Sequence, residues 1–339
     1  MPTACVTGAA GFIGFHLCRR LLENGWAVVG IDCLNDYYDV TLKRDRLKLL
    51  TSHEQFEFYH LNICHEEELC DVYARQRLDY TVHLAAQVGV RYSLENPRAY
   101  TQNNVAGFLN ILECCRSNST KHLVYASSSS VYGLNAKVPF SVRDGVDHPV
   151  SIYAATKRTN ELMAHVYSHL YSLPTTGLRF FTVYGPWGRP DMAPFIFTKA
   201  ILEGTPIKLF TDGRVKRDFT FIDDVIDGIM SIIERIPRSG KSHAMTGPNR
   251  SWAPYRIYNI GNRQAVDLEH VLHLIESYTN RKADYVRLPM QPGDVPFTCA
   301  DVSELTEATG FSPRTSIEEG LHAFVTWYRE YYSQQMVRE

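Results

Sequence analysis

Short hydrophobic runs alternate with longer stretches of helical periodicity through the first half of the chain. The short runs lie at residues 3–7, 27–32, 56–59, 80–84, 122–127 and 176–181. The helical patterns lie at residues 11–24, 40–50, 66–77, 97–116 and 151–171. Strands that alternate with helices predict a parallel sheet with helices on both faces, because each parallel connection must cross the sheet. The pattern therefore predicts an α/β fold with a doubly wound parallel sheet.

The regular alternation ends at a stretch rich in Gly, Pro and Trp, residues 184–190. The elements expected beyond it are shorter and more mixed, at residues 194–203, 207–210, 222–235, 256–260, 268–278 and 317–331. This change predicts a sheet domain over residues 1–183 and a smaller C-terminal lobe over residues 184–339. Some segments of the lobe are expected to interleave with the first domain.

Composition narrows the class of function. The 339 residues are 45% hydrophobic and 21% charged, as in globular proteins. A net charge of -2 offers no basic surface for nucleic acid or for an anionic membrane. No apolar run approaches the roughly 20 residues of a membrane span. We therefore expect a small-molecule substrate, with neither nucleic acid nor membrane as a partner.

The N-terminus and the cysteines predict a compartment. The first residues lack the charged region of a signal peptide. The eight cysteines include no CxxC pair and no spacing typical of a metal site. We therefore expect reduced thiols, a cytoplasmic location and no bound metal.

A glycine-rich loop follows the first predicted strand and opens the first predicted helix. Gly8, Gly11 and Gly14 are spaced by three residues. Glycines let the backbone approach a pyrophosphate, whose charge then lies at a helix N-terminus. An ordinary strand–turn–helix connection is the alternative, but the position in a βαβ unit favours the Rossmann type of dinucleotide site.

Asp32 ends the second predicted strand, 18 residues after Gly14. A carboxylate at this position can accept both ribose hydroxyls and repels a 2′-phosphate, so it favours NAD over NADP. Lys43 and Arg44 lie too far along the chain to be interpreted as a phosphate clamp.

Tyr153 and Lys157 are spaced i, i+4 and therefore share one face of a predicted helix. A free tyrosine has a pKa of about 10 and is a poor base at neutral pH. A neighbouring ammonium favours the phenolate and lowers that pKa. Such pairs are also common on solvated helix faces. The serine cluster at residues 127–130, where the fifth strand ends, favours an active site instead.

These segments resemble the extended members of the short-chain dehydrogenase/reductase superfamily. The resemblance lies in TGxxGxxG at residues 7–14, LAA at 84–86, NNVAG at 103–107 and YxxxK at 153–157. It implies a catalytic set of Tyr153, Lys157 and Ser128. It also implies cofactor contacts from Gly8, Gly11, Phe12, Ile13, Gly14, Asp32, Asn62, Ile63, Leu84, Ala85, Ala86, Asn103, Tyr153 and Lys157. Asn62 is a departure, since the superfamily usually has Asp there, but its side-chain carbonyl can still accept from an adenine amine.

The residues after the catalytic serine bear on the reaction that follows oxidation. Dehydratases of this superfamily place Asp-Glu there, and nucleotide-sugar decarboxylases usually keep a Glu two residues on. This chain has Ser129 and Ser130 at those positions. Neither hydroxyl titrates near neutral pH. The resemblance therefore implies oxidation, rotation of the ketone and return of the hydride to its other face.

The closest resemblance is to the UDP-glucuronate 4-epimerases. It lies in residues 34–39, 87–93 and 179–192, with Thr182 where galactose epimerases usually have Asn. It implies reversible C4 epimerisation of UDP-glucuronate to UDP-galacturonate, through a transient 4-keto intermediate and enzyme-bound NADH. Ser128, Ser129 and Thr182 are then expected beside the sugar.

A uronic acid needs a partner for its carboxylate. Guanidinium binds carboxylate in a planar, two-pronged way, and Arg189 in the uronate-type segment is our choice. The 4-keto intermediate is a β-keto acid, and the same contact would restrain loss of CO₂. Arg91 is a weaker candidate for this carboxylate. The alternative is an arginine pinned in a Pro-rich turn.

The nucleotide is expected to bind the second lobe. By resemblance, Arg217 contacts the diphosphate, Phe210 stacks beside the base, and Gln291 and Asp294 belong to a late nucleotide-binding segment. Galactose epimerases often have Arg at position 291, which leaves a second phosphate contact open. A salt bridge of Arg217 to Asp218 or Asp223 is the alternative.

The superfamily also implies a homodimer. Its members pair two long helices as a four-helix bundle, here residues 97–116 and 151–171. Leu109, Leu112, Leu162 and Val166 are candidates for that interface. The alternative is that these helix faces pack on the sheet.

Other functions stay open at this point. One is a 4-epimerase of UDP-glucose and UDP-galactose or of their N-acetylated forms, and another is a UDP-glucuronate decarboxylase. A third is a catalytically silent NAD-binding regulator, which the presence of Tyr153, Lys157 and Ser128 disfavours.

Overall fold

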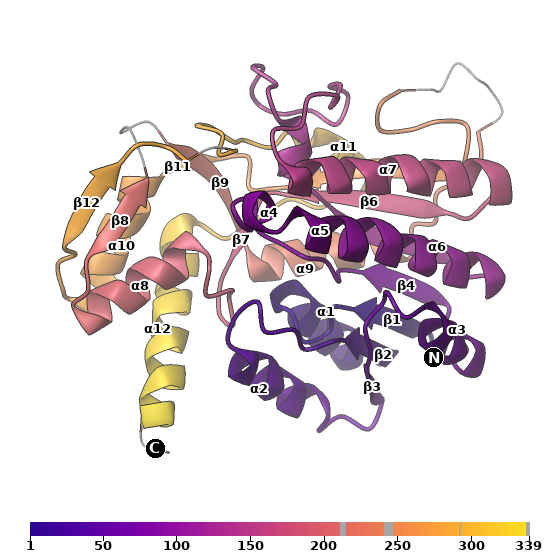
Figure 1. The fold of residues 1–339 in the computed structure, drawn as a ribbon, viewed down its shortest axis with the longest axis horizontal. Coiled ribbons are helices and arrows are strands. Elements are labelled where there is room, and N and C mark those ends of the chain that lie inside the picture. The colour runs from indigo at the N-terminus through magenta and orange to yellow at the C-terminus, as the bar shows by residue number, and fades with distance from the viewer. Residues whose placement is uncertain (211–214, 241–246, 292, 337–339) are drawn as a thin grey trace.

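The computed structural model describes residues 1–210, 215–240, 247–291 and 293–336. Its centre is a seven-stranded parallel sheet of order β10-β6-β5-β4-β1-β2-β3 (Figure 1). The predicted doubly wound parallel α/β sheet is therefore confirmed. The strands are β1 (Thr3–Thr7), β2 (Ala27–Asp32), β3 (Phe56–His60), β4 (Tyr80–His83), β5 (His122–Ser128), β6 (Thr175–Phe180) and β10 (Tyr255–Ile260).

Helices cover both faces of this sheet. One face carries α3 (Glu66–Arg75), α6 (Gly107–Ser117) and α7 (Ile152–Tyr171), which pack on one another. The other carries α1 (Phe12–Glu23), which packs against α2 (Val40–Leu50) and α9 (Ile222–Ile233). The buried side chains form a separate hydrophobic core on each face, so both faces of the strands are apolar.

A second group of elements lies at the carboxyl ends of the strands, on the left in Figure 1. It holds two small sheets, β12-β8 and β11-β9-β7. Their bounds are β7 (Thr182–Tyr184), β8 (Ile207–Phe210), β9 (Lys216–Phe221), β11 (Ala265–Asp267) and β12 (Tyr285–Leu288). The helices here are α8 (Ala193–Glu203), α10 (Leu268–Thr279) and α12 (Ile317–Met336). A short helix, α11 (Ser303–Thr309), lies instead against β10 of the large sheet.

Two expectations from the sequence need correction. The strand expected at residues 256–260 of the smaller lobe pairs with β6 and is the seventh strand of the large sheet. The single helix expected at residues 97–116 is interrupted, since a π-helical turn separates the short α5 from α6, with one further short helix, α4, before them. These pieces are α4 (Tyr92–Glu95), α5 (Pro97–Tyr100) and η1 (Thr101–Ala106). The division between residues 183 and 184 stays a prediction.

The inner face of α7 is held to the sheet by a fully buried ion pair. Arg179 on β6 donates from Nε and Nη2 to the Glu161 carboxylate, at 2.8 and 2.9 Å. The Ser127 hydroxyl donates to the same carboxylate at 2.7 Å. Breaking a buried pair strands a charge in the core, so this contact fixes α7 against the ends of β5 and β6.

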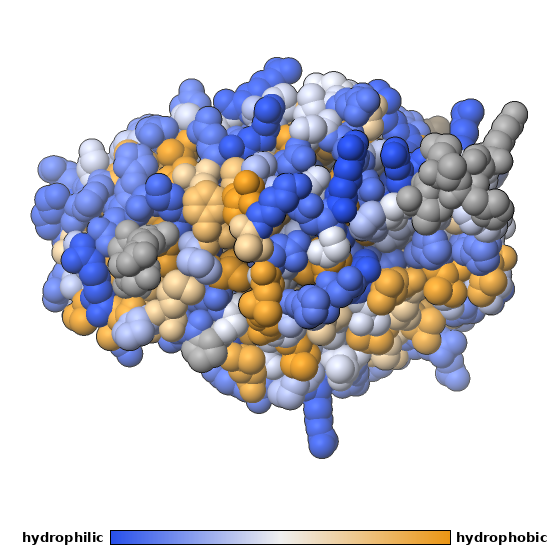
Figure 2. All heavy atoms as spheres, turned by 90° about the horizontal axis from the view of Figure 1, so that it is seen from above, coloured by the Kyte–Doolittle hydropathy of each residue, from blue (hydrophilic) through white to orange (hydrophobic). Residues whose placement is uncertain are grey.

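The outer faces of α6 and α7 expose hydrophobic side chains. Leu109, Leu162 and Val166 are 41 to 52% exposed. Leu112 is fully buried in the core between α6 and the sheet, so its predicted place in a dimer interface is wrong. Seen from above, hydrophobic residues gather in patches among polar ones (Figure 2). Within the described ranges, no helix is long and apolar enough to cross a membrane.

Candidate active site

A cavity of about 940 Å³ lies between the carboxyl edge of the large sheet and the second group of elements. Parallel α/β sheets bind their ligands at this edge. Of the residues predicted from sequence, the following line it: Gly8, Gly11, Phe12, Ile13, Gly14, Asp32, Asn62, Ile63, Leu84, Ala85, Ala86, Arg91, Asn103, Ser128, Ser129, Tyr153, Lys157, Thr182, Arg189, Phe210, Arg217 and Asp294. Gln291 is the predicted residue that does not line it.

The loop between β1 and α1 and the first turn of α1 each accept only glycine at one position. Gly8 has φ +73°, and a Cβ there would lie 2.8 Å from the Ala85 nitrogen. A Cβ on Gly14 would lie 2.0 Å from the Gly8 carbonyl oxygen. The bare backbone and the N-terminus of α1 face the cavity, which fits the pyrophosphate of a dinucleotide.

Asp32 anchors the same loop and also faces the cavity. Its Oδ2 accepts from the Ala10 N–H at 3.1 Å, and its Oδ1 accepts from the Leu34 N–H at 2.8 Å. Each oxygen keeps a lone pair, so the carboxylate can still accept from ribose hydroxyls. Its negative charge fits NAD better than NADP.

Lys43 lines the cavity despite its distance along the chain from the glycine loop, and the expectation that it does not clamp a phosphate stays a prediction. Its Nζ donates to the backbone and side-chain oxygens of Asn35, at 2.6 and 2.5 Å. It also lies 4.7 Å from the centroid of the Tyr38 ring. The segment between β2 and α2 folds back over the loop, which spacing along the chain does not reveal. Arg44 is exposed.

Arg46, which was not singled out in the sequence, joins the cofactor loop to the turn after β7. Its side chain is fully buried. Nη1 donates to the Ala10 carbonyl at 2.8 Å and to the Tyr38 hydroxyl at 2.9 Å. Nη2 donates to the Trp187 carbonyl at 2.6 Å. The only sequence signal was its place among the buried leucines of an amphipathic helix.

The two polar residues predicted at the adenine end have other bonds as well. Asn62 Oδ1 accepts from the Cys64 N–H at 3.0 Å. Asn103 lies in the π-helical turn and donates from Nδ2 to the Ala99 carbonyl at 2.8 Å. Each residue lines the cavity, and the Asn62 oxygen keeps a second lone pair for an amine.

Tyr153 and Lys157 lie together on α7, with Lys157 donating to the Ala126 carbonyl at 2.9 Å. Burial lowers the pKa of Lys157 to about 8. Burial raises the pKa of Tyr153, while the Ser128 hydroxyl and the Arg189 charge act to lower it. Ser128 and Arg189, rather than the expected ammonium of Lys157, therefore favour the phenolate in the protein alone.

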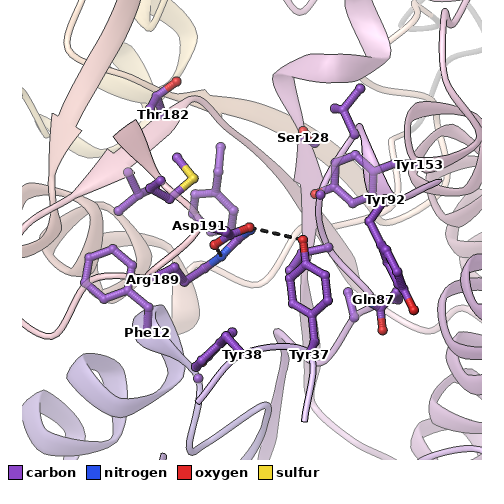
Figure 3. Close-up of a pocket in the computed structure, with 18 of the residues that line it drawn as sticks. Phe12, Tyr37, Tyr38, Gln87, Tyr92, Ser128, Tyr153, Thr182, Arg189 and Asp191 are labelled. Carbon is purple, nitrogen blue, oxygen red and sulfur yellow. Dashed lines mark hydrogen bonds and ion pairs between the residues drawn. The ribbon is translucent and has the colours of Figure 1, made fainter. Parts of the chain in front are cut away.

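The serine side chains at residues 127–130 do not all have the same role. Ser127 turns toward Glu161 inside the protein, as described above. Ser128, the last residue of β5, accepts from the Ser130 N–H at 3.1 Å and lies beside Tyr153 (Figure 3). Ser129 and Ser130 also line the cavity, and neither supplies a carboxylic acid next to the tyrosine.

Arg189 is held by an aspartate that sequence analysis did not single out. Its Nε donates to Asp191 Oδ1 at 3.0 Å and its Nη2 donates to Oδ2 at 2.5 Å. The Tyr37 hydroxyl donates to Oδ2 of the same carboxylate at 3.2 Å (Figure 3). Burial raises the pKa of Asp191, but the Arg189 charge outweighs it and holds that pKa below its usual value.

This pairing changes how Arg189 can bind a ligand. The Nε–Nη2 fork, one of the two forks of a guanidinium, is taken by Asp191. The end-on fork of Nη1 and Nη2 has no partner among the described residues. A second carboxylate can therefore be bound in a two-pronged way only at this end. Arg189 is therefore held in its turn by Asp191 and can still bind a ligand carboxylate.

Arg91 lines the cavity between an aspartate and an aromatic ring. Its Nη2 donates to Asp294 Oδ2 at 2.9 Å, and its guanidinium lies 4.6 Å from the centroid of the Phe210 ring. It is therefore grouped with two residues predicted to hold the nucleotide. Its predicted role as a weaker candidate for the sugar carboxylate stays a prediction.

Arg217 lines the same cavity, from the start of β9. Its Nη1 donates to the Pro296 carbonyl at 3.1 Å. No ion pair to Asp218 or Asp223 forms within the described part of the chain, and Asp218 instead accepts from the backbone N–H of Ala300 at 2.9 Å. Burial lowers the pKa of Arg217. Among the residues that the structure describes, no carboxylate is bound to this guanidinium, which suits a diphosphate contact.

Gln291 contributes through its backbone. Its carbonyl accepts from the Asp294 N–H at 3.1 Å, and this turn brings Asp294 into the cavity wall. Its predicted direct contact with the substrate is not supported by its position. The sequence alone does not show which of Gln291 and Asp294 faces the cavity, since both lie in one short turn.

Comparison with known proteins places the chain among epimerases. A profile of the NAD dependent epimerase/dehydratase family matches residues 4–261. Protein CapI of Staphylococcus aureus is 50% identical over 329 residues, covering 96% of this chain and 98% of that protein. The probable UDP-glucuronate 4-epimerase of Rhizobium meliloti (strain 1021) is 46% identical over 331 residues, covering 96% and 97%.

A solved structure agrees with these matches. The crystal structure of UDP-glucuronic acid 4-epimerase from Bacillus cereus, in complex with UDP-glucuronic acid and NAD, superposes with a TM-score of 0.87. It is 33% identical in sequence, and the match covers 97% of this chain and 100% of that chain.

Proposed function

The chain belongs to the NAD dependent epimerase/dehydratase family, and on that premise we propose that it interconverts UDP-glucuronate and UDP-galacturonate by inverting C4. One observation carries the proposal. A single cavity joins the glycine loop, Tyr153 with Ser128, and the guanidinium of Arg189, with serines where an eliminating enzyme needs acids. The activity in the names of similar proteins supports it.

NAD, when bound, would accept the hydride from C4, and the resulting NADH would return it to the opposite face of the C4 ketone. The residues that would hold it are those of the glycine loop, Asp32 and Lys43. Lys43 is an addition, made because it lines the cavity and its ammonium is held by Asn35, three residues after Asp32. Lys157 lines the same cavity one helical turn after Tyr153 and is proposed to hold the nicotinamide ribose.

Tyr153 is the proposed base. It removes the proton from the C4 hydroxyl as the hydride leaves and returns it after the ketone has rotated. Ser128 is placed to bond the same hydroxyl and to hold the phenol in line. Burial raises the phenol's pKa, and the Ser128 hydroxyl and the Arg189 charge act against that rise.

Arg189 is the proposed partner of the C6 carboxylate, through its end-on fork. The 4-keto intermediate is a β-keto acid, and its C5–C6 bond breaks most easily when it stands perpendicular to the ketone plane. A guanidinium that holds C6 near that plane opposes loss of CO₂. Ser129 and Thr182 line the same cavity and are proposed to complete the sugar site.

The nucleotide end is assigned to four residues. Arg217 contacts the diphosphate, Phe210 packs beside the base, and Asp294 accepts from hydroxyls of the uridine ribose. Arg91 is reassigned here, because it bridges Phe210 and Asp294.

The proposal is tested by incubating the protein with UDP-glucuronate and catalytic NAD, and following the sugar by proton NMR. We expect signals of the C4-inverted UDP-galacturonate to grow until equilibrium, without net NADH. Turnover of UDP-glucose with none of UDP-glucuronate would establish the galactose-type alternative. Release of CO₂ with a UDP-pentose would establish a decarboxylase, and no turnover with NAD bound would establish a silent regulator.

We also propose a cytoplasmic homodimer that pairs α6 and α7 with their copies. The support is the exposed row that includes Leu109, Leu162 and Val166, and the absence of a disulfide among the eight cysteines, all of which are free. Leu162→Glu should convert a dimer into a monomer in sedimentation velocity, while Leu134→Glu, on an exposed loop residue elsewhere, should not. A wild-type monomer at micromolar concentration would contradict the proposal.

A further inference from the structure

The turn at residues 189–191 pairs an arginine with an aspartate across one proline. Two parallel hydrogen bonds of 3.0 and 2.5 Å fix the plane of the Arg189 guanidinium on Asp191. Side chains of both residues are about a quarter exposed, at 23 and 29%, and the exposed parts face the cavity. The direction of the end-on fork is therefore set by Asp191.

Tyr37 ties this pair to the other side of the cavity. It lies between β2 and α2, in the cofactor half, and its hydroxyl donates to Asp191 Oδ2 at 3.2 Å. Its ring packs on Tyr92 with centroids 5.2 Å apart, and Tyr92 packs on Tyr100, which contacts Tyr153 edge-on at 6.1 Å. The aspartate is thus held from both halves of the protein, within a layer of aromatic rings that ends at the proposed base.

The electrostatics place the pair close to the reacting groups. The Arg189 charge lowers the pKa of Tyr153, and the Asp191 charge raises it. Burial and the Asp191 charge raise the pKa of Tyr37 to about 12, so Tyr37 stays a hydrogen-bond donor at neutral pH. A surface ion pair remote from the site would affect neither phenol.

We propose that Asp191, held by Tyr37, is a positioning residue that aims the end-on fork of Arg189 at the substrate carboxylate. The inference rests on the proposed function. Its consequence is control of the fate of the 4-keto intermediate. When C6 leaves the ketone plane, the C5–C6 bond breaks, its electron pair forms the enolate at C4–C5, CO₂ departs and C5 takes a proton.

Two variants loosen the arginine without removing it. Asp191→Asn keeps the size of the side chain but removes its charge and one acceptor. Tyr37→Phe removes only the donor to Asp191. Asp191→Glu restores a carboxylate and serves as the conservative rescue. Asp71→Asn is the matched control, because it breaks an Arg–Asp pair on α3 in which the side chains are mostly exposed.

The decisive readout is the ratio of CO₂-loss products to UDP-galacturonate, measured by proton NMR on NAD-loaded protein. We expect this ratio to rise at least about tenfold in Asp191→Asn, since small displacements of a positioning group have large effects on reaction geometry. Tyr37→Phe should raise it less, Asp191→Glu should lower it again, and Asp71→Asn should leave it at the wild-type value.

Unchanged product ratios in Asp191→Asn and Tyr37→Phe, with kcat and KM altered or not, would overturn the inference and indicate a purely structural pair. Melting temperatures of the variants are measured alongside, and a ratio that rises only in variants that also unfold would overturn it equally. Failure of the proposed function is seen separately, as absence of UDP-glucuronate turnover by the wild-type protein.

Discussion

Replacing Tyr153 with Phe is expected to lower kcat for UDP-glucuronate about a thousandfold while NAD stays bound, in the middle of the range for loss of a general base. The variant keeps the ring that packs against Tyr100 and removes only the hydroxyl. Because Lys157 keeps its bond to the Ala126 carbonyl, the cofactor side of the site should keep its shape.

The measurement is the initial rate of C4 inversion by NMR, with bound cofactor quantified after denaturation of the protein. Tyr92→Phe is the matched control, since Tyr92 lines the same cavity and its hydroxyl has no proposed role in proton transfer. Retention of more than a tenth of the wild-type rate by Tyr153→Phe would refute the assignment of the base.

Replacing Arg189 with Ala is expected to lower kcat/KM for UDP-glucuronate about a hundredfold and for UDP-glucose far less. Truncating one partner of a buried, hydrogen-bonded charge pair costs about 2 to 5 kcal/mol, and each 1.4 kcal/mol is a factor of ten. UDP-glucose has no carboxylate, so the loss of the Arg189 guanidinium removes no ionic contact from it. Arg189→Lys should recover only part of the loss, because an ammonium lacks the planar fork.

The single variant leaves Asp191 as an unpaired carboxylate on the cavity wall, which itself repels an anionic substrate. The double variant with Asp191→Ala removes that repulsion. It should still lose more kcat/KM for UDP-glucuronate than for UDP-glucose. Both sugars are measured by the same coupled NMR assay. Equal losses for the two substrates in the double variant would falsify the role of Arg189.

Most elements of the first half could be predicted from the sequence because their signals are local. The alternation of strands and helices reports burial on both faces of a parallel sheet. The glycine spacing at Gly8 and Gly14 indicates a close approach of backbone segments. In the structure, a Cβ at either position would clash with backbone atoms of Ala85 or Gly8. Asp32 could be placed beside it because the second parallel strand ends at the same edge of the sheet.

The errors concern contacts between segments distant in the chain. Residues 256–260 have the hydrophobic pattern of a strand, but that pattern does not show which sheet the strand joins. Leu112 has the same hydrophobicity as Leu109, and only the packing of α6 separates the buried residue from the exposed one. Arg46 was not singled out, and Lys43 was judged too far along the chain, because tertiary contacts rather than sequence spacing bring Arg46 to the Ala10 carbonyl and Lys43 to the cavity wall.

The sequence by itself determined the fold class, the cofactor loop and the Tyr153–Lys157 face, since each depends on residues within a few turns of one another. The tertiary structure decided what surrounds them. It buried Lys157, left Tyr153 half-buried, gave Asp191 one fork of Arg189, and placed Arg91 between Asp294 and Phe210. Burial and pairing depend on groups that meet only after folding, so no local pattern encodes them.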